Sequence, residues 1–357
     1  MLFLNFLAII FILLAYLAPW INPKTFWPVA FFGIAYPVLL IINILFILFW
    51  LLRKPPVALL SLVIILLGWN ALRKNLGFHI NPETPAKTTT DIRLMTYNVH
   101  MFRSFDESHT LDRKKAILNV FQEIAPDVLC LQEFYTRKKG ENDLQSALKN
   151  EFGFKHHFFS PVAQNEYDAY GIAIFSKYPI LRTGYITLQQ SKPGHSRLLY
   201  ADIQVGNQEI RVYNIHLKSI GFKQEDYAFI RKANTDMEED ITSTKRIGGR
   251  LKAAFQKRAQ EAEALSAHLQ ACPVPFLVAG DFNDTPLSFA VNKISRNAQN
   301  TFVKKGSGWG ITYNGDFPNF QIDYIMASAD FRVRHYAIIK QKLSDHYPVW
   351  TDLSLKD

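Results

Sequence analysis

The stretch PFLVAGDFND, residues 275–284, joins an apolar run directly to a polar turn. The uncharged first half is typical of a buried β-strand. Asp281 and Asn283 lie two residues apart on the turn that follows, so their side chains can face the same point. A carboxylate at such a point can take a proton from water while the neighbouring amide orients that water. The stretch therefore predicts a strand that ends at a catalytic site.

Other polar side chains also follow apolar runs. Glu133 comes two residues after the run at 128–131, and Asn98 lies near the end of an earlier run. Asp345 and His346 are adjacent, so in extended backbone their side chains diverge and can serve two different groups. Carboxylate and amide oxygens suit Mg²⁺, which takes few protein ligands and keeps water and substrate phosphate as the others. The pattern indicates a metal site assembled from distant segments.

The chain from residue 91 onward alternates strand-like and helix-like patterns. Residues 113–123 and 251–270 repeat apolar positions at helical spacing. Many short strands between a few long helices predict an α/β fold in which two packed sheets are flanked by helices. The predicted strands are 92–99, 128–131, 171–175, 198–205, 210–215, 275–279, 321–326 and 348–353.

Taken together and in order, these motifs resemble those of the endonuclease/exonuclease/phosphatase superfamily, the deoxyribonuclease I-like fold. The resemblance runs from about residue 92 to residue 353. It implies a four-layer α/β sandwich of two packed mixed sheets flanked by helices. It also implies hydrolysis of a phosphate ester with Mg²⁺, or with Mn²⁺ as the alternative ion. The motifs in chain order are TYN (96–98), LQE (131–133), GIAIFS (171–176), NIHL (214–217), GDFN (280–283), IDY (322–324) and SDH (344–346).

The resemblance implies a role for each matching residue. Glu133 corresponds to the principal metal ligand, assisted by Asn98 and Asp345. Asp281 corresponds to the residue that aligns or deprotonates the attacking water, and Asn283 to one that contacts the phosphate.

Two histidines complete the implied site. His346 would contact the scissile phosphate and be oriented by a hydrogen bond to Asp323, while His216 matches the histidine of the deoxyribonuclease and phosphatase branches. Arg197 is placed like a phosphate-binding arginine of the family. In the deoxyribonuclease branch the histidine at the His216 position has a carboxylate partner. Neither Glu166 nor Asp168 is in register for that role, so the sequence leaves the partner open.

The net charge of +9 is unevenly distributed. Residues 1–90 contain six basic residues and one acidic residue, so they carry +5 of it. The remaining 34 basic and 30 acidic residues leave only +4 for the rest of the chain. A nucleic-acid-binding domain is normally more basic, so the charge does not by itself indicate a nucleic-acid partner.

Residues 1–72 are almost uncharged and contain three apolar runs, at 2–17, 29–52 and 57–69. A membrane-spanning helix needs roughly 17–25 mostly apolar residues, which the second run supplies, the first nearly supplies and the third supplies only with its flanks. A signal peptide would need a basic start and a small-residue cleavage site, and residues 1–20 show neither. We therefore expect about three transmembrane helices.

This pattern divides the chain into a membrane region (1–72), a linker (73–90) and a catalytic domain (91–357). With three spans the basic residues balance across the membrane, so the positive-inside rule does not fix the orientation. The secreted deoxyribonuclease branch of the family implies a catalytic domain outside the cytoplasm. The expected localisation is the cell membrane, as a multi-pass protein with an extracytoplasmic domain.

These observations predict a membrane-anchored hydrolase of phosphomonoesters or phosphodiesters. The bilayer is the expected partner, a lipid headgroup or lipid-linked phosphate the favoured substrate, and no obligate protein partner is inferred. The alternative is a membrane-anchored nuclease acting on nucleic acid. A non-catalytic membrane scaffold is an alternative of another class, disfavoured because the set of site residues is complete. Residues 218–258, with ten basic and six acidic residues, form either a solvated surface or a lip that attracts anionic headgroups.

Overall fold

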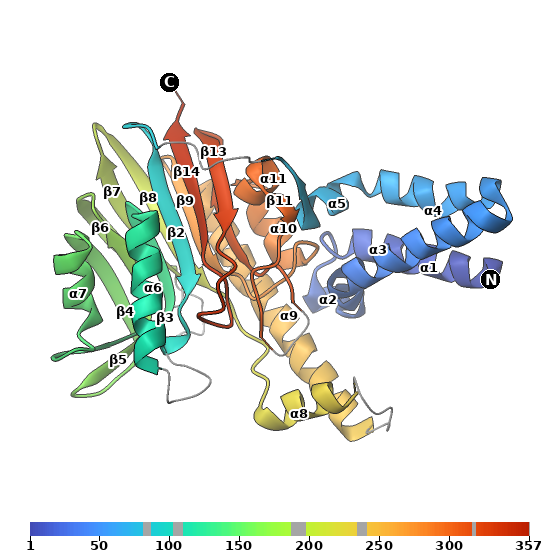
Figure 1. The fold of residues 1–357 in the computed structure, drawn as a ribbon, viewed down its shortest axis with the longest axis horizontal. Helices are drawn as coiled ribbons and strands as arrows, with labels where there is room; N and C mark the ends of the chain where they lie inside the picture. Colours follow the sequence, from blue (N-terminus) through green and yellow to red (C-terminus); the bar gives the residue numbers. More distant parts are fainter. Residues whose placement is uncertain (81–86, 103–109, 187–197, 234–240, 316–318, 357) are drawn as a thin grey trace.

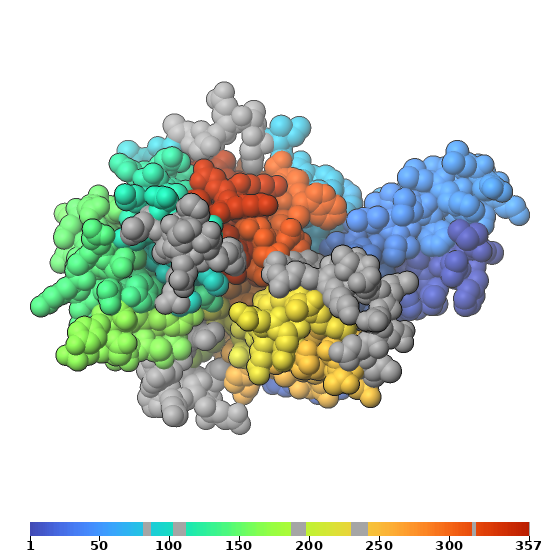
Figure 2. Space-filling view, turned by 60° about the horizontal axis from the view of Figure 1, so that its bottom comes forward, coloured from blue at the N-terminus to red at the C-terminus, as the bar shows by residue number. Residues whose placement is uncertain are grey.

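The computed structural model describes residues 1–80, 87–102, 110–186, 198–233, 241–315 and 319–356. Two parts are visible in Figure 1: a layered sandwich of strands and helices, and a group of N-terminal helices that projects from one side of it. Figure 2 shows the N-terminal helices, in blue, as a lobe beside the sandwich.

The first sheet combines strands from both ends of the sandwich. Its described strands are β2 (Ile92–Asn98), β3 (Val128–Arg137), β4 (His156–Gln164), β5 (Asp168–Ser176), β13 (Phe331–Ile338) and β14 (Val349–Leu355). Their order is β13-β14-β2-β3-β5-β4. The neighbours β2 and β3 run parallel, and helix α6 (Thr110–Ile124) lies between them in the sequence. The other neighbouring pairs are antiparallel, so the sheet is mixed.

The second sheet repeats this plan. Its described strands are β6 (Ile180–Tyr185), β7 (Leu198–Val205), β8 (Gln208–His216), β9 (Phe276–Asp281), β10 (Gln299–Asn300) and β12 (Asp323–Ala327). Their order is β10-β12-β9-β8-β7-β6. The neighbours β8 and β9 are parallel, and α8 (Gln224–Ala233) and α9 (Ile241–Gln270) lie between them in the sequence.

Three apolar clusters hold these layers together. The central cluster joins the facing sides of the two sheets, for example Leu94 and Ile174 with Val212 and Ile325. On the outer face of the first sheet, α6 and α7 (Leu144–Glu151) bury Phe121 and neighbouring apolar residues. On the outer face of the second sheet, α9 and α10 (Phe289–Ser295) do the same. The four-layer α/β sandwich predicted from the sequence is confirmed.

The apolar N-terminal region forms the helices α1 (Leu2–Leu17), α3 (Pro28–Arg53) and α4 (Pro55–Leu67), with the short α2 (Pro23–Phe26) before α3. Among the described residues, α3 is the single helix that is by itself long and apolar enough to cross a membrane. A second candidate arises only if α4 and α5 (Trp69–Asn75), which meet at an angle of 67°, are counted as one broken span.

The prediction of three spans is therefore not supported. Helix α1 has 16 residues, which at about 1.5 Å per residue is roughly 24 Å and falls short of a hydrocarbon core of about 30 Å. The third run is interrupted at Gly68, where a Cβ atom would lie 2.1 Å from the ring of Tyr16. The ring of Tyr16 packs against Gly68, and the chain bends there. Helix α4 therefore ends after 13 residues.

Polar side chains lie inside this helical lobe, and apolar side chains cover its surface. The buried Asn5 amide donates to Ser61 Oγ (2.7 Å), and Ser61 donates to Asn43 Oδ1 (3.1 Å). Trp50 Nε1 donates to Asn5 Oδ1 (3.0 Å), so one network links α1, α3 and α4. Exposed apolar residues on the same helices include Phe3, Ile10, Val38, Ile41, Leu45, Leu48 and Leu67.

The lobe is packed firmly onto the sandwich. Strand β1 (Leu76–Phe78), within the segment expected to begin a linker, pairs with β11 (Ser307–Trp309). Gly33 of α3 approaches the backbone so closely that a Cβ atom there would lie 2.7 Å from Leu287 O. The Asn292 amide donates to Pro19 O (2.8 Å), which ties α10 to the end of α1. The backbone and side-chain contacts fix the lobe against the catalytic part.

Position 280, near the end of β9, can accommodate only a glycine without strain. Its φ is +145°, and a Cβ atom there would lie 1.9 Å from Ile215 O. We expect Gly280→Ala to lower the free energy of unfolding by about 3 kcal/mol, because both overpacking and an unfavourable backbone conformation contribute. Thermal unfolding of the full chain in detergent checks this. Gly248→Ala is the control, since nothing lies within 4 Å of a Cβ there, and it should leave stability equal or slightly raised. Equal melting of the two variants would contradict the expectation.

Candidate active site at one end of the sandwich

The predicted site residues meet at the end of the sandwich where the parallel strands finish. Asn98 is the last residue of β2, His216 of β8 and Asp281 of β9. In the second sheet, Asp281 is the register partner of both His216 and Asp323. Residues far apart in the sequence are thereby placed in one row across the sheet edge.

Glu133 sits on an irregularity in β3. The register of β3 against β5 shifts between Leu131 and Phe134, and Glu133 has a left-handed φ of +51°. A bulge of this kind turns a side chain away from the regular alternation of a strand, and backbone strain in a non-glycine residue is typical of functional sites. Glu133 is 22% exposed although its neighbours are buried, so its carboxylate reaches the cavity at the end of the sheet.

Asp281 is the centre of the buried polar cluster. Its Oδ2 accepts hydrogen bonds from the amides of Asn98 (3.1 Å) and Asn283 (3.0 Å), and its Oδ1 accepts one from the Asn283 backbone N–H (2.8 Å). His216 Nε2 lies 3.5 Å from Asp281 Oδ2. Burial raises the pKa of Asp281 to about 7, against the opposing effect of nearby His346. A carboxyl group with such a pKa can exchange a proton near neutral pH.

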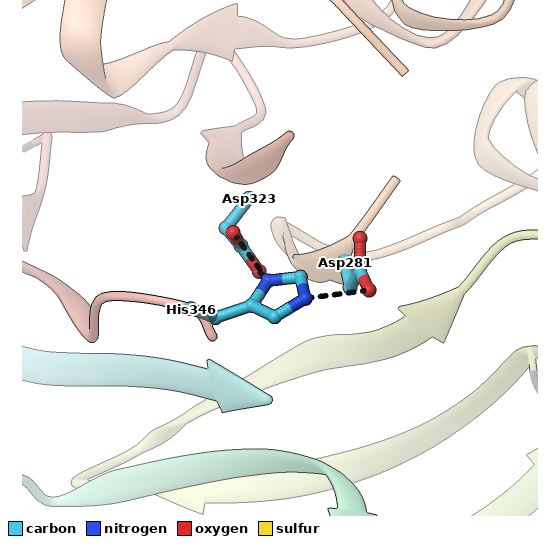
Figure 3. A group of neighbouring side chains, drawn as sticks. All are labelled: Asp281, Asp323 and His346. Carbon is cyan, nitrogen blue, oxygen red and sulfur yellow. Dashed lines mark hydrogen bonds and ion pairs between the residues drawn. The ribbon is translucent and has the colours of Figure 1, made fainter. Parts of the chain in front are cut away.

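Asp323 and His346 form a buried pair, shown in Figure 3. His346 Nδ1 lies 2.9 Å from Asp323 Oδ2, and the opposite ring nitrogen, Nε2, lies 3.8 Å from Asp281 Oδ2. The hydrogen bond predicted between His346 and Asp323 is confirmed. Burial acts to lower the pKa of His346, but Asp323 and Asp281 outweigh it and hold that pKa well above its usual value. The two carboxylates thus favour the cationic form of His346, whose Nε2 is directed to Asp281.

Amide side chains tie the two sheets together beneath the site. The bond from Asn98 to Asp281 crosses from the first sheet to the second. Gln132 Nε2 donates to Asn214 Oδ1 (2.7 Å), and the Asn214 amide donates back to Ala173 O (2.7 Å). Buried hydrogen bonds of this kind fix the relative position of the sheets, so the groups of the site are held in place before any substrate binds.

Two arrangements of acidic groups could hold a metal ion. The first is Asp281, Asp323 and His346, which are buried and have ligand atoms within 4.8 Å of one another. Asp323 is hydrogen-bonded to His346, and Asp281 accepts two hydrogen bonds at Oδ2 and one at Oδ1, so few lone pairs are left for a metal ion. A cationic His346 in that group would also repel a metal ion. The chemistry of this set fits a proton-handling centre better than a metal site.

The second arrangement is formed by Glu133 and Asp345, with Asn98 beside them. Both carboxylates are partly exposed, 22% and 18%, and all three residues line the same cavity. His100 Nδ1 lies 3.6 Å from Glu133 Oε2 and 3.5 Å from Asp345 Oδ1, so it bridges the two acids. Carboxylate and amide oxygens with access to water match the preference of Mg²⁺, and the donor set therefore fits that ion.

The cavity that these residues line has a volume of about 260 Å³. The buried Arg258 of α9 also lines the cavity, forms an ion pair with Asp284 (Nε to Oδ2, 2.9 Å) and donates to Lys218 O. The pair supports the turn that carries Asn283, whose amide also donates to Leu217 O (3.1 Å). One apolar wall comes from Ile34, a residue of α3 in the N-terminal lobe.

The structure brings eight of the nine predicted site residues to this end of the sandwich, while Arg197 lies outside the described residues. The carboxylate nearest to His216 among those described is Asp281. Asp168 is engaged instead by Tyr135 and Arg137. The sequence did not identify His100, Arg258 or Ile34. His100 follows the TYN motif by two residues, which is the only local signal; Arg258 and Ile34 reach the cavity through tertiary packing.

The fold and the groups at its end define a class of protein, the metal-dependent hydrolases of phosphoester bonds. A family model described as the Endonuclease/Exonuclease/phosphatase family matches residues 95–346, and the chain belongs to this family, whose members use divalent metal ions. A second model, described as a Domain of unknown function (DUF8431), matches residues 1–75. No curated protein shows a significant match to the chain.

Solved structures share the fold of the catalytic part. An endonuclease/exonuclease/phosphatase from Beutenbergia cavernae is 20% identical, with a TM-score of 0.52 over 74% of this chain and 72% of that one. A family protein from Bacteroides thetaiotaomicron is 16% identical, with a TM-score of 0.54 over 75% and 99%. A humanized D. rerio TDP2 is 16% identical, with a TM-score of 0.52 over 74% and 100%. At these identities the likeness concerns the fold alone.

Proposed function

We propose that this protein is a membrane-anchored, Mg²⁺-dependent hydrolase that acts on the phosphoester of a lipid headgroup or a lipid-linked phosphate. One observation carries the reaction class: a single cavity receives the carboxylates of Glu133, Asp345 and Asp281 together with the imidazoles of His216 and His346. The proposed domain organisation is a membrane region over residues 1–72, a connecting segment over 73–90 and a catalytic domain over 91–357.

The proposed metal ligands are Glu133, Asn98 and Asp345. Bound there, Mg²⁺, or Mn²⁺ in its place, would supply positive charge to the phosphate oxygens. The remaining chemistry belongs to the chain itself. His346, held as a cation by Asp323, faces the same point and stabilises negative charge that develops on the phosphate. The Asn283 amide, fixed on the turn after β9, is placed to contact a phosphate oxygen.

Asp281 is the proposed proton acceptor. A water oxygen forms a bond to phosphorus, one of its protons passes to the Asp281 carboxylate, and the P–O bond to the leaving group breaks. The leaving oxygen then takes up a proton. A pKa of about 7 lets Asp281 accept a proton from water and release it again near neutral pH. His216, 3.5 Å from Asp281 Oδ2, keeps that carboxylate oriented, and Arg197 is proposed as a further phosphate contact.

The apolar surface of the N-terminal lobe supports a membrane anchor. Around an apolar core that includes Ile12 and Leu40, the lobe buries Asn5, Asn43 and Ser61, and its surface exposes many large apolar side chains, as a soluble helical bundle rarely does. Small and polar residues at helix interfaces are characteristic of helices packed in a bilayer. We propose that the projecting part of the lobe inserts into the lipid, with α3 beyond Ile41 packed between α1 and α4.

Aromatic residues indicate where the lobe meets the membrane surface. Several are exposed at the base of the lobe, where it joins the sandwich: Trp20, Phe26, Trp69, Phe78 and Trp309. The rings of Trp69 and Phe78 are stacked 5.1 Å apart, and Trp20 lies 4.9 Å from the guanidinium of Arg296. Tryptophan side chains collect at the interface between lipid and water. This placement brings the active site close to the headgroups and favours a lipid substrate over soluble nucleic acid.

An assay of the purified full chain tests the proposal. With Mg²⁺ we expect hydrolysis of phospholipids or isoprenyl phosphates, and with EDTA we expect activity to fall at least a hundredfold and to return when Mg²⁺ is restored. Plasmid DNA is assayed in parallel. Rapid nicking of plasmid without lipid turnover would overturn the lipid assignment in favour of a nuclease, and activity that persists in EDTA would overturn the metal requirement.

We also propose that the catalytic domain lies outside the cytoplasm, as the secreted deoxyribonuclease branch suggests. Figure 1 shows that the N-terminus lies at the far end of the lobe from the sandwich. Protease treatment of intact cells is expected to remove a C-terminal tag, while the same tag on a cytoplasmic protein survives. A protected tag that becomes accessible only after lysis would place the domain in the cytoplasm.

A further inference from the structure

Helix α3 contributes to the substrate site. Ile34 lines the catalytic cavity together with Asn98, Glu133 and His346. A second cavity, of about 210 Å³, lies next to the first and shares Thr285 and Phe320 with it. The second cavity is lined on its other side by Pro37 and Ile41.

These α3 residues form a continuous stripe. Ile34, Pro37 and Ile41 are spaced by three and four residues, so they lie on one face of the helix. Ile41 is exposed, and the helix continues away from the sandwich with exposed Ile44, Leu45 and Leu48. The stripe therefore runs from the phosphate site to the surface of the helix that is proposed to contact lipid.

Two buried polar side chains, Gln321 and Thr285, are among the residues that line the second cavity, and Thr285 lines the first cavity as well. The side-chain amide of Gln321 is 4% exposed, and neither its Nε2 nor its Oε1 has a hydrogen-bond partner among the described residues. The Thr285 hydroxyl, in a residue 5% exposed, likewise has none within the described part of the chain. A buried amide without partners is destabilising by about 1–3 kcal/mol, so such groups normally receive a ligand or water.

The geometry points to a specific substrate shape, and this rests on the hydrolase function proposed above. We propose that the substrate is a phospholipid whose phosphate lies at Glu133 and His346, whose ester or amide linkage pairs with Gln321 and Thr285, and whose hydrocarbon chain lies along Ile34, Pro37 and Ile41. The order of the three zones, charged, then polar, then apolar, matches the order of groups in such a lipid. Helix α3 is then a specificity element as well as an anchor.

An isoprenyl phosphate matches this order less well. It has a hydrocarbon chain directly beyond the phosphate, which leaves the Gln321 amide and the Thr285 hydroxyl unpaired. A nucleic acid would need contacts for further phosphates, and the residues described around the second cavity include the rings of Trp309 and Phe320 but no lysine or arginine. The groove therefore selects for an acyl-chain phospholipid.

The full chain in nanodiscs allows a direct test. Turnover of dioleoyl phosphatidylglycerol is compared with turnover of soluble bis(p-nitrophenyl) phosphate, and the ratio of the two rates is the readout. Ile41→Trp fills the groove, and Gln321→Leu removes the amide while keeping its volume. Val38→Trp is the matched control, because Val38 is exposed on α3 and lines neither cavity. We expect each groove variant to lower the ratio about tenfold, the effect of losing about 1.4 kcal/mol of binding, and the control to leave it unchanged.

A binding measurement accompanies the kinetics. Metal-free full chain is heated with short-chain phosphatidylglycerol or with farnesyl phosphate, and the shift in melting temperature is recorded. We expect the phospholipid to stabilise the wild type more than farnesyl phosphate does, and Gln321→Leu to abolish that difference. Unfolding of Gln321→Leu is not expected, since the amide makes no hydrogen bond that the change would remove.

The outcomes separate the two proposals. If both substrates are hydrolysed and the ratio is unaffected in both groove variants, the groove assignment is wrong and the hydrolase function stands. If the wild type hydrolyses neither substrate, the proposed function fails, and the binding arm decides the groove: equal shifts with phosphatidylglycerol and farnesyl phosphate would overturn it.

Discussion

Glu133→Gln is expected to reduce hydrolysis at least a thousandfold while the protein stays folded. The change keeps the shape of the side chain on the bulge of β3 and removes the negative charge that faces the cavity. A thousandfold loss corresponds to about 4 kcal/mol of transition-state stabilisation, which is of the size expected for a lost metal contact. Initial rates with saturating Mg²⁺ measure the effect. The metal-free variant should melt no lower than wild type, because one acid less faces Asp345.

The matched control is Glu151→Gln, at the exposed end of α7. It makes the same chemical change away from the cavity and should retain full activity. Mg²⁺ is expected to raise the melting temperature of wild type and of the control, but not of Glu133→Gln. Near-wild-type turnover by Glu133→Gln would refute the role assigned to this carboxylate.

His346→Ala is expected to cause a loss of similar size, because the fixed cation at the centre of the site disappears. The free energy of unfolding of this variant should also fall, by about 1–3 kcal/mol, since the buried Asp323 carboxylate loses its hydrogen-bonded partner. The neighbouring carboxylates hold the pKa of His346 well above its usual value, so wild type keeps this charge through neutral pH. Deprotonation of His346 should therefore cause no loss of wild-type activity up to neutral pH, and a pH–rate profile checks this.

His346→Gln separates the two effects. Its amide can still donate to Asp323 but carries no charge. We expect stability close to wild type with activity as low as in His346→Ala. If His346→Gln were nearly as active as wild type, a hydrogen bond alone would suffice and the cationic role would be wrong.

Much of the fold was predictable because its inner strands have a clear apolar pattern. All of the strands predicted from the sequence are present in the structure, although their ends differ by a few residues. The strands of the two large sheets that were missed, β4, β6, β10 and β13, each lie at the edge of a sheet, and the short pair β1 and β11 was missed as well. Edge strands are polar along part of their length, and β4 also contains Pro161 next to a register shift. The sequence pattern of such a segment therefore resembles that of a loop.

The site was predictable where function is concentrated at strand ends. The motif residues from Asn98 to His346 are adjacent in space because both pairs of parallel strands end at the same edge. The roles assigned to them remain predictions. What the sequence could not show is the contribution of the N-terminal lobe: Ile34 is one apolar residue within an apolar run, and nothing local distinguishes it from its neighbours. The number of spans was overestimated because hydropathy does not reveal the bend at Gly68.

The rigid junction between the lobe and the sandwich has a kinetic consequence. Because Gly33 packs on Leu287 and β1 pairs with β11, the proposed membrane anchor would hold the active site at a constant height above the bilayer. Such an enzyme meets its substrate by lateral diffusion in two dimensions. Its rate should then follow the mole fraction of substrate in the membrane and respond little to the total amount of lipid in the assay, so diluting the substrate with inert lipid would slow the reaction at constant bulk concentration.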